Sequence, residues 1–112
     1  MRLLSDSELA RQTAELAHWQ IDGGKLCRKI VFEDFIEAFS FISKVALVSH
    51  SMNHHPEWRN VFNEVEIMLV SHDVQGISDL DIRLATEIDE LLARSSGGSP
   101  SKANAGVRSG TT

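Results

Sequence analysis

The stretch His50-Ser-Met-Asn-His-His-Pro-Glu-Trp58 joins a long helical pattern to a strand pattern, and the rest of the chain is arranged around it. The adjacent His54 and His55 cannot share one face of a regular element, so we expect their side chains to point in different directions. Pro56 favours an extended backbone at His55 and removes a hydrogen-bond donor. The stretch therefore predicts a stiff connection that presents two imidazoles close to a large aromatic ring.

Three segments carry helix start signals followed by apolar residues at helical spacing. The first helix is predicted over 5–17, where Ser5 and Glu8 form a Ser-x-x-Glu capping box. The second begins at Asp34 and the third at Ser78, and each has an acidic residue three positions later. We expect the second helix to face the core through an apolar stripe made of Phe35, Ala38, Phe39, Ile42, Val45, Ala46 and Met52.

Two further apolar residues of the second helix, Phe41 and Val48, lie off that stripe. We expect them to form a second apolar patch that either contacts another subunit or is an ordinary exposed pair. A domain of this size often gains stability by oligomerising.

Four short segments have the alternation of apolar and polar residues that is typical of strands. Segments 19–21 and 26–32 flank the turn signal Asp22-Gly23-Gly24, which predicts a hairpin. Segments 57–62 and 64–72 form a second pair around a bend at 60–63, with His72 closing the last strand. The predicted order is α-β-β-α-β-β-α. The predicted fold class is α+β, with a four-stranded antiparallel sheet and helices packed on one face.

Composition limits the classes of function. The net charge is 11 − 16 = −5 and there is no basic patch, which argues against direct binding to nucleic acid. No apolar run is long enough to span a membrane and no signal-peptide core follows Met1, so we expect a cytoplasmic protein. The single Cys27 permits no internal disulfide. We expect one folded domain at 1–94 and a disordered tail, rich in Ser, Gly, Ala and Thr, at 95–112.

The histidines allow four interpretations. In the first, they are surface or hydrogen-bonded side chains with no shared role. In the second, they are metal ligands, because His50 and His54 have i, i+4 spacing and His72 could add a third ligand. Nucleophilic catalysis by a serine has no supporting motif such as Gly-x-Ser-x-Gly. The fourth interpretation is acid–base chemistry by His54 and His72 on a small molecule, with His55 and Trp58 shaping the pocket. Two imidazoles can hold opposite protonation states near neutral pH, which suits an elimination.

Several motifs of this chain resemble those of the pterin-4a-carbinolamine dehydratase family. The resemblance extends from about Leu4 to Leu92, and its most specific part is the His-His-Pro-x-Trp core followed by a histidine at the end of a later strand. The matching motifs are Phe32-x-Asp-Phe-x-x-Ala-Phe39, Val45-Ala46, Asn53-His-His-Pro-Glu-Trp-x-Asn-Val-Phe-Asn63, Ser71-His72, Gly76-Ile-Ser-x-x-Asp81 and Leu84-Ala85.

The resemblance implies a lyase of tetrahydropterin recycling that uses no cofactor and no metal. Such enzymes dehydrate 4a-hydroxytetrahydrobiopterin, which aromatic amino acid hydroxylases produce, to quinonoid dihydropterin. The implied catalytic residues are His54 and His72 as acid–base groups and His55 as the residue that orients the pterin. The implied substrate-binding residues are Asn53, His55, Pro56, Trp58, Ser71, Asp73 and Asp81. Asp81 also occupies the N3 position of the third predicted helix, so a capping role explains it equally well.

One position departs from the family pattern. Many members have glutamate four residues before the first active histidine, where this chain has His50. A carboxylate there would stabilise the cationic form of a neighbouring imidazole and a histidine would not. We therefore expect the rate or the pH optimum to differ from those of such members.

The resemblance also implies a homodimer or homotetramer, and a pathway shared with an aromatic amino acid hydroxylase. The alternative function is a non-catalytic dimerisation, assembly or transcription-coactivator module on the same fold. That module would depend on the off-stripe residues Phe41 and Val48, whereas the enzyme would depend on the three imidazoles. The sequence leaves open the natural pterin, the choice between dimer and tetramer, the role of His50 and the function of the tail.

Overall fold

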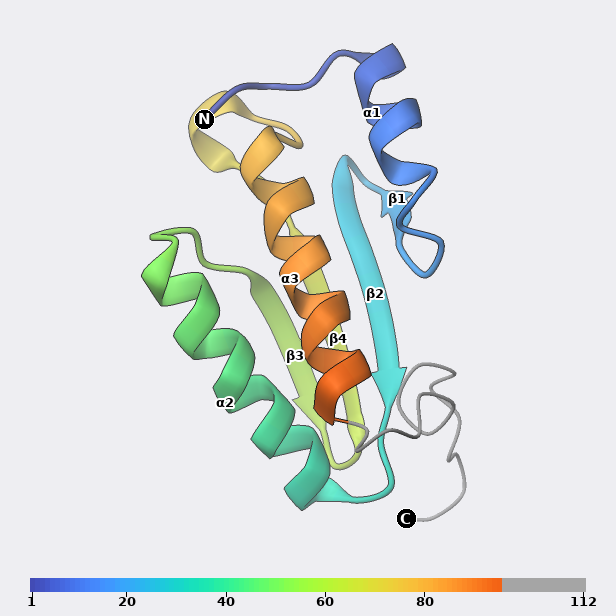
Figure 1. Cartoon of the computed structure of the whole chain (residues 1–112), viewed down its shortest axis with the longest axis vertical. Helices are drawn as coiled ribbons and strands as arrows, with labels where there is room; N and C mark the ends of the chain where they lie inside the picture. Colours follow the sequence, from blue (N-terminus) through green and yellow to red (C-terminus); the bar gives the residue numbers. More distant parts are fainter. Residues whose placement is uncertain (96–112) are drawn as a thin grey trace.

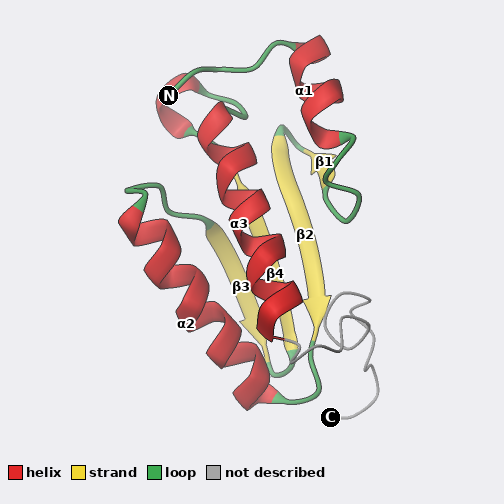
Figure 2. Cartoon of the chain, viewed as in Figure 1, coloured by secondary structure: helices red, strands yellow, loops and turns green. Residues whose placement is uncertain are grey.

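The predicted element order is confirmed by a computed structural model, which describes residues 1–95 (Figures 1 and 2). Two long helices cover one face of a single antiparallel sheet, as expected for the α+β class. The elements are α1 (Asp6–Thr13), β1 (Gln20–Asp22), β2 (Lys25–Val31), α2 (Phe35–Ser51), β3 (Glu57–Val61), β4 (Glu64–Leu69), the 3-10 turn η1 (His72–Val74) and α3 (Asp79–Ser95).

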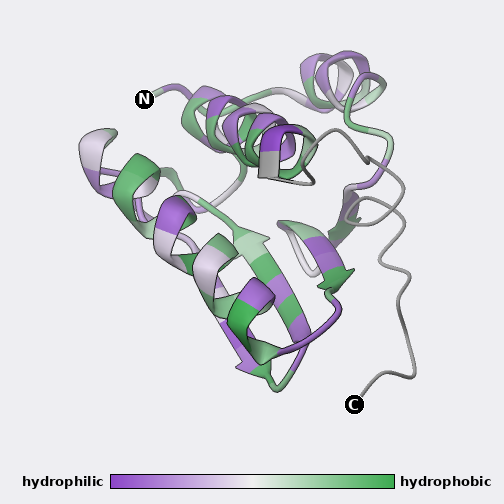
Figure 3. Cartoon of the chain, turned by 60° about the horizontal axis from the view of Figure 1, so that its bottom comes forward, coloured by the Kyte–Doolittle hydropathy of each residue, from purple (hydrophilic) through white to green (hydrophobic). Residues whose placement is uncertain are grey.

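The strands lie in the order β1-β2-β4-β3, so the two hairpins pair through their longer strands. In the central pair, Leu26 lies opposite Leu69 and Ile30 lies opposite Val65. These four side chains are almost completely buried, because alternate residues of both strands face the helices. Figure 3 shows the alternation as bands of hydrophobic and hydrophilic colour along the strands. Strand β3 is left at one edge of the sheet, beside α2 (Figure 1).

Helix α2 faces the core with a different side from the one predicted. Phe41, which was expected off the stripe, is 2% exposed and packs against Phe32 with ring centroids 5.2 Å apart. Phe35 and Phe39, which were expected in the core, are 43% and 53% exposed. Positions 38, 41, 45 and 52 also follow helical spacing, so the helix has two apolar sides and its own periodicity does not decide between them. The interpretation of Phe41 as a subunit contact was therefore wrong.

The exposed side of α2 carries the apolar residues that could meet a partner. Ile36 is 70% exposed and Leu47 is 74% exposed, in addition to Phe35 and Phe39. The rings of Phe35 and Phe39 lie 5.7 Å apart and form a small aromatic cluster on this surface. We call Phe35, Ile36, Phe39 and Leu47 the outer face of α2.

The last strand ends earlier than predicted. Strand β4 stops at Leu69, and His72 lies in η1 instead of closing the strand. The chain turns there because Ser71 and Gly76 exchange two backbone hydrogen bonds, of 2.9 and 3.3 Å, around a left-handed Gln75. This loop delivers His72 to the end of the sheet where the chain leaves α2 for β3. Of the predicted tail, 95–112, all but Ser95 lies outside the described residues.

Candidate active site

Two segments that meet at one end of the sheet each contribute one histidine and one carboxylate. The segment before β3 provides His54 and Glu57, and the segment after β4 provides His72 and Asp81. The pairs form crosswise between the segments. His54 Nε2 lies 2.6 Å from Asp81 Oδ1, and His72 Nε2 lies 3.0 Å from Glu57 Oε2. Two imidazoles are thus each tied to an acid from the other segment.

His54 is fixed by the way α2 ends. Met52 caps the helix, and Asn53 then adopts a left-handed conformation with φ of 53°. This reversal lets the backbone N–H of His54 donate to the Ser49 carbonyl at 3.0 Å and turns the His54 side chain inward, where it is 7% exposed. Asparagine tolerates this conformation better than most residues do, which accounts for Asn53 at the turn. Its side chain is exposed and makes no contact with the pocket described below.

Asp81 both caps α3 and faces His54, so its contacts are compatible with each of the two interpretations left open by the sequence. Its Oδ2 accepts a hydrogen bond from the Ser78 backbone N–H at 2.9 Å, as an N3 residue of a capping box does. The same oxygen accepts from the Ser71 hydroxyl at 2.8 Å, while Oδ1 faces His54. A carboxylate that is 0% exposed requires such partners, because an unpaired buried charge is costly.

His72 belongs to a more open arrangement. The His72 side chain is 75% exposed, and its partner Glu57 is 36% exposed. The other oxygen of Glu57, Oε1, accepts a hydrogen bond from Lys25 Nζ at 2.6 Å. The hydrogen bonds from Lys25 and then from His72 hold the pKa of Glu57 below its ordinary value, so this carboxylate is ionised at neutral pH. Sequence analysis missed Glu57 and Lys25, because only the strand order β2-β4-β3 brings these two residues together.

His55 pairs with His50. Nδ1 of His50 lies 3.3 Å from Nε2 of His55, and the ring centroids are 5.5 Å apart. The line between the two nitrogens therefore runs nearly from ring centre to ring centre, as in a hydrogen bond between imidazoles. One ring donates and the other accepts, and the tautomers decide which.

A pocket of about 390 Å³ lies beside this histidine pair, between the last turns of α2 and the start of β3. Its lining residues are Ala46, Leu47, Ser49, His50, His55, Pro56 and Trp58. Three predicted substrate-binding residues, His55, Pro56 and Trp58, therefore lie in its wall. Ala46, Leu47 and Ser49 were not predicted to line a pocket, because a different face of this helix was expected to meet the core.

The remaining predicted residues do not line this pocket. His54 directly precedes His55 of the wall, and it is buried with Asp81 and Ser71 in one hydrogen-bond network. His72 is linked to the pocket wall through Glu57, the residue that directly follows Pro56. Asp73 is exposed on η1.

The metal interpretation of the histidines does not match the observed contacts. The i, i+4 pair His50 and His54 diverges, since His50 turns to His55 and Nε2 of His54 is taken by Asp81. In residues 1–95, no three His, Cys, Asp or Glu side chains are grouped so that they could hold a metal ion.

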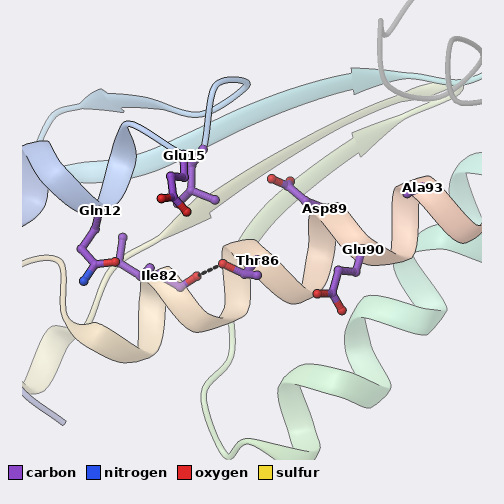
Figure 4. Close-up of a pocket in the computed structure, with 8 residues that line it drawn as sticks. Gln12, Glu15, Ile82, Thr86, Asp89, Glu90 and Ala93 are labelled. Atoms are coloured by element: carbon purple, nitrogen blue, oxygen red, sulfur yellow. Dashed lines mark hydrogen bonds between the residues drawn. The ribbon is translucent and has the colours of Figure 1, made fainter.

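A second pocket, of about 300 Å³, lies between α1 and α3 and has a different character (Figure 4). Its wall carries three carboxylates, Glu15, Asp89 and Glu90, and no histidine. Asp89 is already engaged, since it accepts hydrogen bonds from Arg28 at 2.6 Å and from Trp19 at 2.8 Å. This pocket therefore lacks the imidazoles that distinguish the first one. Over residues 1–95, no helix is both long enough and apolar enough to cross a membrane.

Comparisons with known proteins place the chain among relatives of one family and one fold. Residues 2–91 match the family described as pterin 4 alpha carbinolamine dehydratase. A Synechococcus protein provisionally named as such a dehydratase is 49% identical over 89 residues, which are 80% of this chain and 96% of the relative. A Solibacter usitatus protein with the same provisional name is 46% identical over 90 residues, covering 80% of this chain and 95% of the relative. The crystal structure of a Brucella melitensis protein described as a transcriptional coactivator/pterin dehydratase has a TM-score of 0.76 and 35% identity, covering 80% of this chain and 97% of that one.

Proposed function

Because this chain belongs to the pterin 4 alpha carbinolamine dehydratase family, we propose that it is a lyase that dehydrates 4a-hydroxytetrahydrobiopterin to quinonoid dihydropterin and water. The observation that carries the proposal is the crosswise pairing of two imidazoles with two carboxylates beside an aromatic-walled pocket. An elimination that removes one proton and delivers another needs two groups that titrate near neutral pH.

The proposed reaction balances without a co-reactant. The bond from carbon 4a to the hydroxyl oxygen breaks as that oxygen receives a proton, and water leaves. The N5–H proton is removed, and its electron pair forms the double bond between N5 and carbon 4a. No electrons enter or leave the system, so neither a redox cofactor nor a metal is required by the chemistry.

The two histidines suit different steps. Nε2 of each ring faces a carboxylate, so in the neutral ring Nε2 carries the hydrogen and Nδ1 keeps a lone pair. We assign removal of the N5 proton to Nδ1 of His54, which has no other hydrogen-bond partner in residues 1–95. We assign protonation of the hydroxyl to His72, because an exposed imidazole can be reprotonated directly from water.

The pocket supports the binding part of the proposal. Trp58 and Pro56 offer a flat apolar wall to a pterin ring, and the neighbouring His55 can hydrogen-bond to its polar edge. In this proposal Asn53, Ser71, Asp73 and Asp81 support the substrate site through the loops and the hydrogen-bond network that position the three histidines.

The proposed setting follows from the substrate. The enzyme would act in the cytoplasm on the carbinolamine that an aromatic amino acid hydroxylase releases, and its product would be reduced again to tetrahydropterin. The net charge of −5 gives no support for direct contact with nucleic acid.

The test is the dehydration of freshly generated 4a-hydroxytetrahydropterin, followed by its ultraviolet change. The wild-type protein is compared with His54→Ala and His72→Ala, and with His18→Ala as a matched control outside the site. General acid–base groups contribute about a hundredfold or more. We expect clear acceleration by wild type and by the control, and a steep loss in both site variants. A folded wild-type protein that does not accelerate the reaction would overturn the proposal.

A second candidate function is a non-catalytic dimerisation or coactivator module, and the outer face of α2 favours it. Phe35, Ile36, Phe39 and Leu47 expose apolar surface next to the edge strand β3, which is a suitable place for a homodimer or homotetramer contact. The relative from Brucella melitensis is described by both functions. The two candidates separate experimentally, because substitutions of Ile36 or Phe39, which do not line the pocket, would abolish assembly, and substitutions of the histidines would abolish only dehydration.

A further inference from the structure

We infer that Glu57, held in place by Lys25, is a positioning residue for His72. The inference rests on the proposed function, because it gives His72 its proton-donating role. It adds two residues, one on β3 and one on β2, to a site that the sequence motifs assign only to histidines and their neighbours. Neither residue lines the pocket, so both would act through His72 and not on the substrate directly.

The exposure of His72 is the reason that it needs a positioning residue. Three quarters of its side chain is open to solvent, so packing leaves its ring largely unrestrained. Its hydrogen bond to Glu57 is the contact that fixes the ring among residues 1–95. An imidazole without that bond samples several rotamers, and only some of them present Nδ1 to a bound ring.

Glu57 is well placed to provide this restraint. It follows Pro56 directly, so its backbone moves with the pocket wall. Its two oxygens are used separately, one at 3.0 Å from His72 Nε2 and the other at 2.6 Å from Lys25 Nζ. Because β3 and β2 both pair with β4, Glu57 and its partner Lys25 are both held by the same sheet. The result is a chain of contacts from the sheet, through Lys25 and Glu57, to the imidazole.

The charged side chains around the Lys25–Glu57–His72 contacts set the expected pH effects. The charged residues on the outer surface of the sheet are Asp22 on β1, Lys25 and Lys29 on β2, Glu57 and Arg59 on β3, and Glu64 and Glu66 on β4, and Asp73 follows His72 on η1. The carboxylate of Glu57 stabilises an imidazolium at His72, and Lys25 weakens that effect by neutralising the carboxylate. Removing Glu57 and removing Lys25 should therefore shift the loss of protonated His72 in opposite directions.

The variants are Glu57→Gln, Glu57→Met and Lys25→Gln in the full chain. Glu64→Gln is the matched control, because Glu64 forms a similar ion pair with Lys29 at 3.6 Å on the same sheet surface, with no histidine attached. We measure kcat and KM of the dehydration across pH. Glu57→Met should lower kcat about threefold to fivefold with KM nearly unchanged, which is the range for an exposed charged pair. Glu57→Gln should lose less, since its amide oxygen can still accept from Nε2.

The pH profile is the readout that a merely structural role would not move. In Glu57→Gln the alkaline limb of kcat should shift to lower pH, and in Lys25→Gln it should shift to higher pH. Glu64→Gln should match the wild type. Equal kcat values and coincident alkaline limbs in Glu57→Gln and Glu64→Gln would overturn the inference while leaving the proposed function intact. A wild-type protein without activity would instead overturn the proposed function.

Discussion

The His54–Asp81 pair and the His72–Glu57 pair use the same chemistry in opposite surroundings. The side chains of the first are 8% and 0% exposed, and those of the second are 75% and 36% exposed. Burial fixes the first imidazole by packing and by a network of hydrogen bonds, whereas the second is fixed by one bond that solvent can compete for. Under the proposed function, the difference teaches that a rigid proton acceptor and a solvent-linked proton donor can be built from the same pair of groups by changing how deeply the pair is buried.

The buried pair is made possible by shared partners. Asp81 accepts hydrogen bonds from the Ser71 hydroxyl and from the Ser78 backbone N–H in addition to facing His54. The hydroxyl oxygens of Ser71 and Ser78 also lie 2.7 Å apart. No buried side-chain nitrogen or oxygen in residues 1–95 is left without a partner. The same carboxylate thus starts α3 and orients a histidine, so the fold and the site depend on one residue.

The largest expected effect is that of Asp81→Asn. The amide oxygen can still accept from the Ser78 N–H, which leaves the amide nitrogen facing His54. A donor there forces the hydrogen of His54 onto Nδ1 and removes the lone pair that we propose takes the N5 proton. We expect kcat to fall about a hundredfold or more, measured in the dehydration assay.

The control for this variant is Asp79→Asn, which changes an exposed carboxylate in the first turn of the same helix. The Asp79 carboxylate accepts a hydrogen bond from the Arg2 backbone N–H. The control variant should retain wild-type kcat. A folded Asp81→Asn protein with more than about a third of wild-type activity would contradict the assignment of the buried pair, because loss of a general base costs far more than that.

Formation of a homo-oligomer would change the surroundings of the exposed His72–Glu57 pair and leave those of the buried His54–Asp81 pair unchanged. Glu57 lies on the edge strand β3, next to the outer face of α2. Ile36→Glu or Phe39→Glu would place a charge in an apolar contact worth about 1.5–3 kcal/mol per side chain. Because about 1.4 kcal/mol corresponds to a tenfold change, we expect the dissociation constant of the oligomer to rise more than about tenfold. Light scattering measures this change. Ala10→Glu, an exposed change on α1, should have no effect; assembly that survives both charged variants would place the contact elsewhere.

The histidine pair in the pocket offers a smaller test of positioning by a neutral partner. His50→Asn keeps a polar atom close to the position of Nδ1, which faces His55, whereas His50→Leu removes it. We expect KM for the pterin to rise about threefold in His50→Leu and to stay near the wild-type value in His50→Asn, because one hydrogen bond is worth about 0.5–1.5 kcal/mol. Equal KM values in the two variants would show that His50 does not orient His55.

The smallest expected effect concerns the pH dependence of stability. The Lys25 hydrogen bond is the main cause that lowers the pKa of Glu57, so its stabilisation is present above the ordinary pKa of a glutamate and is lost as the pH falls through the lowered value. We expect Lys25→Gln to lower Tm by about one or two degrees near neutral pH, as is usual for exposed pairs. The difference should vanish in acid, and a difference that persists there would assign the effect to another cause.

The sequence predicts the fold well because its signals are local. Capping residues at Ser5, Asp34 and Ser78, and the turn at Gly23 and Gly24, mark where elements begin and end. It fails where two local patterns are equally good, as on α2, whose two apolar sides are distinguished only by packing against the sheet. His72 was assigned to a strand because the backbone bonds between Ser71 and Gly76 that end β4 leave no signal in composition.

The site was only partly predictable for a similar reason. The histidines and Asp81 stand in sequence motifs, whereas Glu57 and Lys25 acquire a role only through the order of three strands. The pocket wall from α2 depends on which side of that helix faces the core. Motifs therefore pointed to the residues proposed to move protons, and tertiary structure was needed to find the residues that hold them.

The most direct test of the central claim is a crystal structure of the protein with 7,8-dihydropterin, which lacks the 4a-hydroxyl group and is not dehydrated. The account predicts a ring against Trp58 and Pro56, with its N5 and C4a edge between Nδ1 of His54 and Nδ1 of His72. A ring bound in the acidic pocket between α1 and α3, or one whose C4a edge points away from both imidazoles, would contradict it.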